Sequence, residues 1–168
     1  MKLASLEDLY VNELRDLYSA ENQLLKALPK VAKAATSQEL RSAFEDHRKE
    51  TEGHVERLER IFTGLEVSPK GKKCKAMEGL IEEGKEVIEE DADAEIKDAA
   101  LIAAGQRVEH YEMAGYGCVR TFAQILGRND EVKLLQQTLD EERAADNKLT
   151  ALAENGINLK ATTTGSVE

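Results

Sequence analysis

The sequence predicts an all-α protein in which four long helices form a bundle of two antiparallel hairpins. The composition disfavours a sheet protein, because aromatic residues make up 4% of the chain, tryptophan does not occur and only two prolines interrupt 168 residues. Apolar residues recur at steps of three and four along four long segments, which is the period of amphipathic helices. The length fits a single domain with a substantial core.

The first hairpin is expected from residues 5–35 and 37–65. Ser5 is a suitable N-cap, since Asp8 follows three residues later in a pattern close to a capping box. Pro29 lies inside the apolar pattern of the first helix and predicts a kink or an early end there. Thr36 and Ser37 supply the break between the two helices, and so short a connection makes them antiparallel neighbours.

The second hairpin is expected from residues 94–126 and 130–154. Residues 127–130 read Gly-Arg-Asn-Asp, which is typical of a helix stop, a turn and a new cap. Asn155 and Gly156 predict the end of the last helix. Residues 157–168 are therefore expected to form a C-terminal tail.

A crossover of about 28 residues, from about 66 to 93, joins the two hairpins. It opens with a basic, turn-rich loop over residues 68–73 and continues with an amphipathic pattern between Met77 and Ile88, which predicts a short helix. A connection this long can carry the chain from one end of a bundle to the other. That is the connectivity of ferritin-like four-helix bundles, and we predict one such bundle over residues 1–156.

The charge excludes several classes of partner. The chain has 33 acidic and 23 basic residues and a formal net charge of −10, whereas nucleic acids and anionic membranes attract positively charged surfaces. No apolar run is long enough to span a bilayer, and the first residues contain no apolar signal segment, so we expect a cytoplasmic protein. Its two cysteines are too few for a disulfide framework. Cys74, which lies among lysines, is expected to be a reactive thiol or a solvated linker residue, and Cys118 a core residue.

Polar residues interrupt the apolar stripes in the middle of each long helix. In the hairpins, residues equally far from the turn lie side by side. From a turn near residue 36, Glu50 is about 14 residues on and Glu21 about 15 back, and from a turn near residue 128, Glu142 is about 14 on and Glu112 about 16 back. The offsets in height are only ~1–4 Å, so we expect four carboxylates in one layer of the core.

Such a layer needs cations, because buried like charges are costly unless they are compensated. Two divalent ions would neutralise four carboxylates, and iron is the first choice for this mixture of oxygen and nitrogen donors, with manganese or zinc as alternatives. A surface or salt-bridged role for the acidic residues is the alternative reading. The expected metal ligands are Glu21, Glu50, His54, Glu109, Glu112, Glu142 and Asp146, and the residues expected to support them are Asp16, His47 and Tyr116.

Four stretches of the chain carry a family resemblance, namely residues 13–21, 47–58, 108–116 and 139–146. Together with residues 74–77 of the crossover, they resemble the YciE/YciF family of bacterial stress-associated proteins, within the ferritin-like superfamily. The resemblance implies a four-helix bundle, a homodimer, a cytoplasmic setting and a link to stress response. Ferritins and rubrerythrins carry Glu-x-x-His on two helices, whereas this chain has Glu50-x-x-x-His54 and Glu142-x-x-x-Asp146.

The sequence therefore predicts a stress-response protein with a carboxylate-rich dinuclear metal centre, engaged in metal or peroxide handling. A second hypothesis is a structural or interaction protein without enzymatic activity, in which the polar layer is a hydrogen-bonded network or a metal clamp. The sequence leaves open whether the protein is an enzyme.

Overall fold

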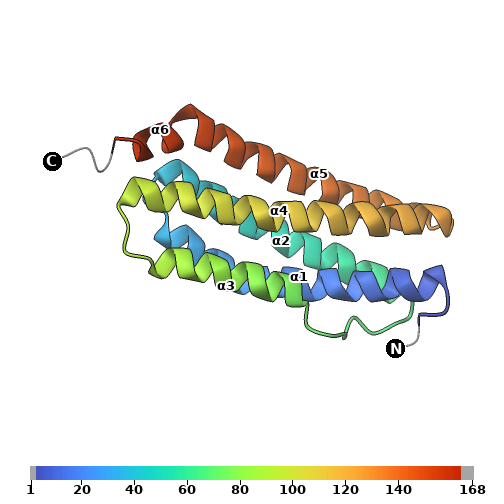
Figure 1. Cartoon of the computed structure of the whole chain (residues 1–168). Coiled ribbons are helices and arrows are strands. Elements are labelled where there is room, and N and C mark those ends of the chain that lie inside the picture. Colours follow the sequence, from blue (N-terminus) through green and yellow to red (C-terminus); the bar gives the residue numbers. More distant parts are fainter. Residues whose placement is uncertain (1–2, 164–168) are drawn as a thin grey trace.

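The computed structural model describes residues 3–163 and is helical throughout, apart from the connections. Four long helices lie side by side, with a shorter helix packed alongside them (Figure 1). The long helices are α1 (Leu6–Ala34), α2 (Gln38–Gly64), α4 (Ala94–Ile125) and α5 (Asn129–Leu152). The shorter elements are α3 (Lys75–Glu89), a π-helical turn η1 (Ala153–Ile157) and α6 (Asn158–Ala161). The predicted all-α, ferritin-like bundle is confirmed.

Helices α1 and α2 form the first hairpin and begin where the sequence predicts. Ser5 and Ser37 are the N-caps, and their hydroxyls accept hydrogen bonds from the backbone N–H groups of Asp8 and Leu40. Pro29 does not end α1, which continues to Ala34. Pro29 is exposed on the helix surface, where water can satisfy the carbonyl group that its missing N–H leaves unpaired.

A buried carboxylate from α4 holds the turn between α1 and α2. Asp98 accepts hydrogen bonds from the backbone N–H of Thr36 at 2.8 Å, from the Thr36 hydroxyl at 2.6 Å and from the backbone N–H of Ser37 at 2.7 Å. The side chain is 4% exposed, so these charge-assisted bonds lie away from competing water. The first hairpin is thereby joined to the second at its turn.

The crossover contains the predicted short helix. Its first part, residues 65–74, runs without helical structure to α3, which packs against α1 and α4. Cys74 is the N-cap of α3 and is 1% exposed, so it is neither a solvated linker residue nor a thiol open to reagents. The neighbouring Lys73 and Lys75 are exposed and pair with Glu78, whereas Cys74 Sγ lies 2.9 Å from the hydroxyl of Tyr111.

Helices α4 and α5 form the second hairpin, which turns at Gly127. The positive φ of 73° at Gly127 lets Arg128 donate its N–H back to the carbonyl of Ala123. Cys118 is exposed, although the sequence suggested a core position, because it lies off the buried stripe of α4. The last helical segment also extends beyond its predicted end at Gly156. Ile157 is buried in the core and draws the chain into α6, and residues 164–168 of the expected tail lie outside the described part.

The core consists of two apolar clusters at different heights in the bundle. One cluster includes Leu28, Phe44 and Leu101, and the other includes Leu14, Phe62 and Leu135. Between them, the buried stripes of the four long helices become polar. No helix in the described residues is long and apolar enough to cross a membrane.

Candidate metal centre

The polar layer brings together four glutamates and two histidines from all four long helices. Each of the six side chains belongs to a residue that is at most 5% exposed. Helix α1 contributes Glu21, α2 contributes His47 and His54, α4 contributes Glu109 and Glu112, and α5 contributes Glu142.

Glu142 lies at the centre of this layer and belongs to two groups of potential ligands. Its carboxylate, the carboxylate of Glu21 and the imidazole of His54 offer atoms that lie within 4.8 Å of one another. The second group meets the same criterion and consists of His47, Glu109, Glu112 and Glu142. One carboxylate shared between two such groups is an arrangement that can bridge two cations.

His54 makes close contacts on both sides of its ring. Nδ1 lies 3.0 Å from Glu142 Oε1 and 3.3 Å from Glu21 Oε1, and Nε2 lies 3.1 Å from Glu141 Oε2. Burial of the imidazole disfavours its charged form, but the carboxylates of Glu142 and Glu21 outweigh burial and raise the pKa of His54 to about 10. In the metal-free protein, a proton on His54 thus supplies part of the missing positive charge.

A residue that the sequence analysis missed orients His54. Glu141 accepts a hydrogen bond from Arg57 at 2.8 Å, and its other oxygen faces His54 Nε2. A carboxylate at one ring nitrogen fixes the imidazole tautomer and leaves the other nitrogen, Nδ1, free to bind a metal. The signal in the sequence was weak, because Glu141 is one of many acidic residues on α5 and is recognisable only from its position opposite His54.

Tyr116, which the sequence analysis expected to support the ligands, lies on α4 beside Glu21. Its hydroxyl donates a hydrogen bond to Glu21 Oε1 within a fully buried environment. Burial, followed by the charges of Glu21 and Glu142, raises the pKa of Tyr116 well above its ordinary value. The phenol therefore keeps its proton and holds one oxygen of Glu21 in place.

The second group is poorer in protein partners. His47 Nε2 lies 3.4 Å from Glu109 Oε1 and 3.9 Å from Glu142 Oε2. Burial, then repulsion from Glu142, raises the pKa of both Glu109 and Glu112 well above the usual range of a carboxyl group. Within the described chain, neither carboxylate oxygen of Glu112 has a hydrogen-bond partner.

Whether these residues fit a metal can be judged from the buried ligand atoms that have no hydrogen-bond partner. Buried polar atoms are normally hydrogen-bonded, yet Glu142, His47 and Glu112 each bury two ligand atoms that have no hydrogen-bond partner among residues 3–163, and the contacts of Glu142 and His47 are with other charged or titratable groups of the site. No lysine or arginine of residues 3–163 forms an ion pair with the four glutamates of the layer. A mixed oxygen and imidazole donor set suits iron, manganese or zinc, so the residues present fit divalent cations.

Three of the predicted site residues lie outside this layer. Glu50 is half exposed, and its carboxylate approaches His47 Nδ1 at 3.4 Å from the rim of the bundle. Asp146 accepts a hydrogen bond from Gln106 at 3.1 Å and faces the exposed His110. Asp16 accepts a hydrogen bond from Tyr111.

Their positions follow from where each residue lies on its helix. At ~100° per residue, Glu50 is rotated about 60° from His47, whereas Thr51 is rotated only about 40° the other way and is fully buried. His47, expected only as a supporting residue, therefore takes the inward position on α2 beside His54. Asp146 lies one turn after Glu142 on α5, where it is partly exposed and Gln106 of α4 binds its carboxylate.

A bundle of two helical hairpins around buried carboxylates and histidines defines the class of ferritin-like proteins. Within this class, the chain belongs to the family described as "Domain of unknown function (DUF892)", whose sequence model matches residues 5–162. The chain is 49% identical to the protein YciF of Escherichia coli K12 over 162 residues, which are 96% of this chain and 98% of that protein. The resemblance to the YciE/YciF family is therefore confirmed.

Solved structures agree with this assignment. The crystal structure of the E. coli stress protein YciF superposes with a TM-score of 0.89 over 92% of this chain and 98% of that chain. YcfI of Rhodopseudomonas palustris, described as a candidate structural protein, is 43% identical and superposes with a TM-score of 0.86 over 89% and 95% of the two chains. A protein of Xanthomonas campestris pv. campestris shares the fold at 16% identity, with a TM-score of 0.76 over 97% and 100%.

Proposed function

We propose that this protein is a stress-response metalloprotein that holds two divalent cations, iron being the first choice, between its hairpins. The observation that carries the proposal is the buried layer of four glutamates and two histidines, whose ligand atoms have so few partners of their own. Burying four carboxylates without counterions would cost several kcal/mol each. Two divalent cations would remove that cost, and E. coli YciF, described as a stress protein, supplies the physiological context.

The residues have distinct roles in this proposal. Glu21 and His54 would hold one ion, His47, Glu109 and Glu112 would hold the other, and Glu142 would bridge the two. An iron pair would supply the electrons to reduce oxygen or peroxide. Glu141 keeps the His54 ring oriented, and Tyr116 holds a proton next to Glu21. The burial of the layer keeps bulk water away from these groups.

Metal titration of the full-length protein tests the proposal. Under anaerobic conditions, the metal-free protein should bind two Fe(II) per chain in equilibrium dialysis, whereas Glu142→Gln should lose most of this binding because it removes the shared ligand. Asp140→Asn is the matched control, since that carboxylate is exposed on the same helix, contacts only α5 side chains and should leave the stoichiometry unchanged. Equal iron content in the wild type and Glu142→Gln would exclude the site.

A structural metal clamp is the second candidate function. It is favoured by the near-complete burial of all six side chains, because structural metal sites are typically closed, whereas catalytic ones keep an open position. Oxidation of bound Fe(II) after addition of hydrogen peroxide distinguishes peroxide handling from a structural clamp. Rapid oxidation in the wild type supports peroxide handling, and stabilisation by metal without oxidation supports a clamp.

The homodimer implied by the family resemblance stays a prediction, as does the cytoplasmic setting. Light scattering on the purified chain tests the dimer.

A further inference from the structure

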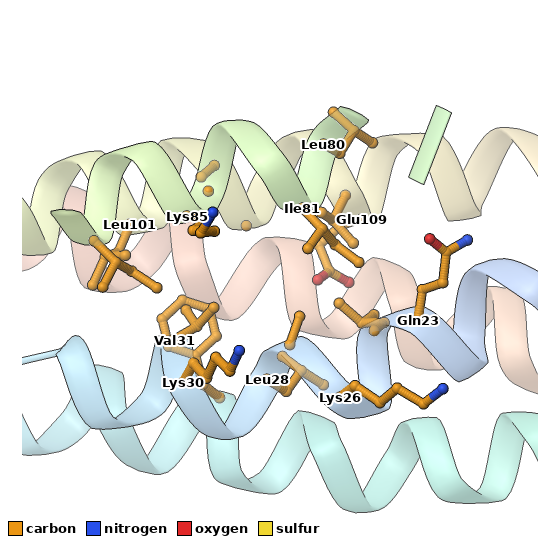
Figure 2. Close-up of a pocket in the computed structure, with 18 of the residues that line it drawn as sticks. Gln23, Lys26, Leu28, Lys30, Val31, Leu80, Ile81, Lys85, Leu101 and Glu109 are labelled. Atoms are coloured by element: carbon orange, nitrogen blue, oxygen red, sulfur yellow. The ribbon is translucent and has the colours of Figure 1, made fainter. Parts of the chain in front are cut away.

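A cleft between α1, α3 and α4 leads from the surface of the protein to the candidate metal centre. It has a volume of about 300 Å³, which is at the lower end of the range for small-molecule sites. Its walls are apolar and include Leu28, Val31, Leu80, Ile81 and Leu101 (Figure 2). Leu28 and Leu101 are buried, whereas Leu80 and Ile81 of α3 are partly exposed, so the cleft runs inward from the crossover helix.

The inner end of the cleft is formed by a ligand candidate. Glu109 lines the cleft, and its carboxylate points into the space between Ile81 and Leu28 (Figure 2). The residue is 3% exposed, and its Oε2 has no hydrogen-bond partner in the described chain, while Oε1 faces His47. An apolar passage thus ends at a buried carboxylate oxygen that has no hydrogen-bond partner among residues 3–163.

The mouth of the cleft is positively charged in an otherwise acidic protein. Lys26 and Lys30 from α1 and Lys85 from α3 line it (Figure 2). Lys85 lies 3.9 Å from Glu89, the one acidic residue at the mouth, and 3.2 Å from Glu82. Lys26 and Lys30 are exposed and form no ion pair with any described residue, which leaves two uncompensated ammonium groups at the entrance.

We propose that this cleft binds a single-chain anionic amphiphile of the fatty-acid class. The carboxylate head would lie between the lysines at the mouth, and the alkyl tail would extend along the apolar walls toward Glu109. Charge complementarity selects an anion at the mouth, and the apolar walls and the volume of about 300 Å³ suit one hydrocarbon chain rather than a polar metabolite or a two-chain lipid. The proposal goes beyond metal binding and needs no ion in the bundle.

Isothermal titration of the metal-free, full-length protein with decanoate tests this site. We expect saturable binding of one decanoate per chain and much weaker binding of decylammonium, which has the same tail and the opposite charge. Equal binding of the two would overturn the assignment of an anionic ligand, and no saturable binding of decanoate would overturn the site. Because the protein is metal-free, neither result depends on whether the centre holds iron.

Two variant pairs locate the ligand within the cleft. The Cβ position of Gly84 faces open space in the cleft, so Gly84→Phe fills the cleft without a backbone clash and should weaken decanoate binding about tenfold. Gly79→Phe is the matched control on α3, because its Cβ position is also free but lies outside the cleft. Lys26→Gln combined with Lys30→Gln should weaken binding about fivefold, whereas Lys33→Gln on the same helix should not. Unchanged affinity in Gly84→Phe would place decanoate elsewhere and refute the proposal.

Discussion

His54 Nδ1 lies 3.0 Å from Glu142 Oε1, and both residues are fully buried in the bundle. In the metal-free protein this contact is an ion pair, because the carboxylates of Glu142 and Glu21 hold a proton on His54. A metal at the same place requires a neutral imidazole, so the ion and the proton compete for Nδ1. In the proposed centre, a bound cation would therefore replace the proton on His54 as the source of positive charge.

The proposed metal centre predicts that bound metal stabilises the folded protein. Removal of bound metal with a chelator should lower the melting temperature by about 5–10 °C, because a ligand at one hundred times its Kd contributes about 2.7 kcal/mol to the folded state. Calorimetry with and without chelator measures the shift. Glu142→Gln is the control and should melt at the same temperature in both conditions. An identical melting temperature for the wild type with and without metal would contradict the proposed centre.

Glu141 should affect the binding of one metal ion and leave the binding of the other unchanged. Glu141→Ala removes the hydrogen-bond partner of His54 Nε2, so the ring loses its fixed tautomer and the affinity of the Glu21–His54–Glu142 group should fall by about 10–100-fold. Competition with a chromophoric chelator resolves the two binding steps. Asp140→Ala is the matched control, since Asp140 is exposed on the same helix and pairs only with neighbouring α5 side chains. Two unaltered binding steps in Glu141→Ala would mean that the ring is held in another way.

The sequence was sufficient to predict how far along the bundle each residue lies. It predicted less well the direction in which each side chain points around the helix axis. Counting from the turns placed Glu21, Glu112 and Glu142 in one layer, and the structure buries all three there. The same counting placed Glu50 in that layer, but Thr51 is the buried residue there. The buried stripe of α2 contains only residues whose direction around the helix axis is close to that of His47. An amphipathic pattern defines the centre of a stripe better than its edges.

Contacts between segments that are far apart in the chain could not be predicted from the sequence. Glu141 supports His54 only because α2 and α5 pack side by side, and nothing distinguishes it locally from the other acidic residues of α5. Cys74 is surrounded by lysines in the sequence but by Ser19, Tyr111 and Met77 in the structure, since the chain turns inward where α3 begins. Its environment depends on the packing of the crossover against α1 and α4.

Asp98 should be important for stability and unimportant for metal binding. Asp98→Ala removes three hydrogen bonds to the turn between α1 and α2 and should lower the free energy of unfolding by roughly 3 kcal/mol. Urea denaturation measures the change. Asp93→Ala is the control, because Asp93 is exposed and its side chain makes no capping hydrogen bond. Metal content should be unchanged in both, since Asp98 lies about 16 Å along α4 from Glu109, and a loss of metal in folded Asp98→Ala would show that the turn positions the centre.

The two thiols should differ sharply in reactivity, in the opposite order to that suggested by the lysines near Cys74. Cys118 is exposed, whereas Cys74 is 1% exposed and burial raises the pKa of its thiol. The thiolate is the reactive form, so Cys74 has less of it at any pH and little access to reagent. An aromatic disulfide reagent at pH 8 should therefore label one thiol per native chain and two in guanidinium.

Two variants show which cysteine is labelled. Cys118→Ser should abolish labelling of the native protein, and Cys74→Ser should leave it unchanged. Cys74 should stay protonated and unlabelled when the pH is raised from 7 to 9, because burial raises the pKa of its thiol. Rapid labelling of Cys74 in the native protein would mean that the N-terminus of α3 opens readily. Since α3 forms one wall of the cleft between α1, α3 and α4, the same opening would expose that cleft and the route to Glu109.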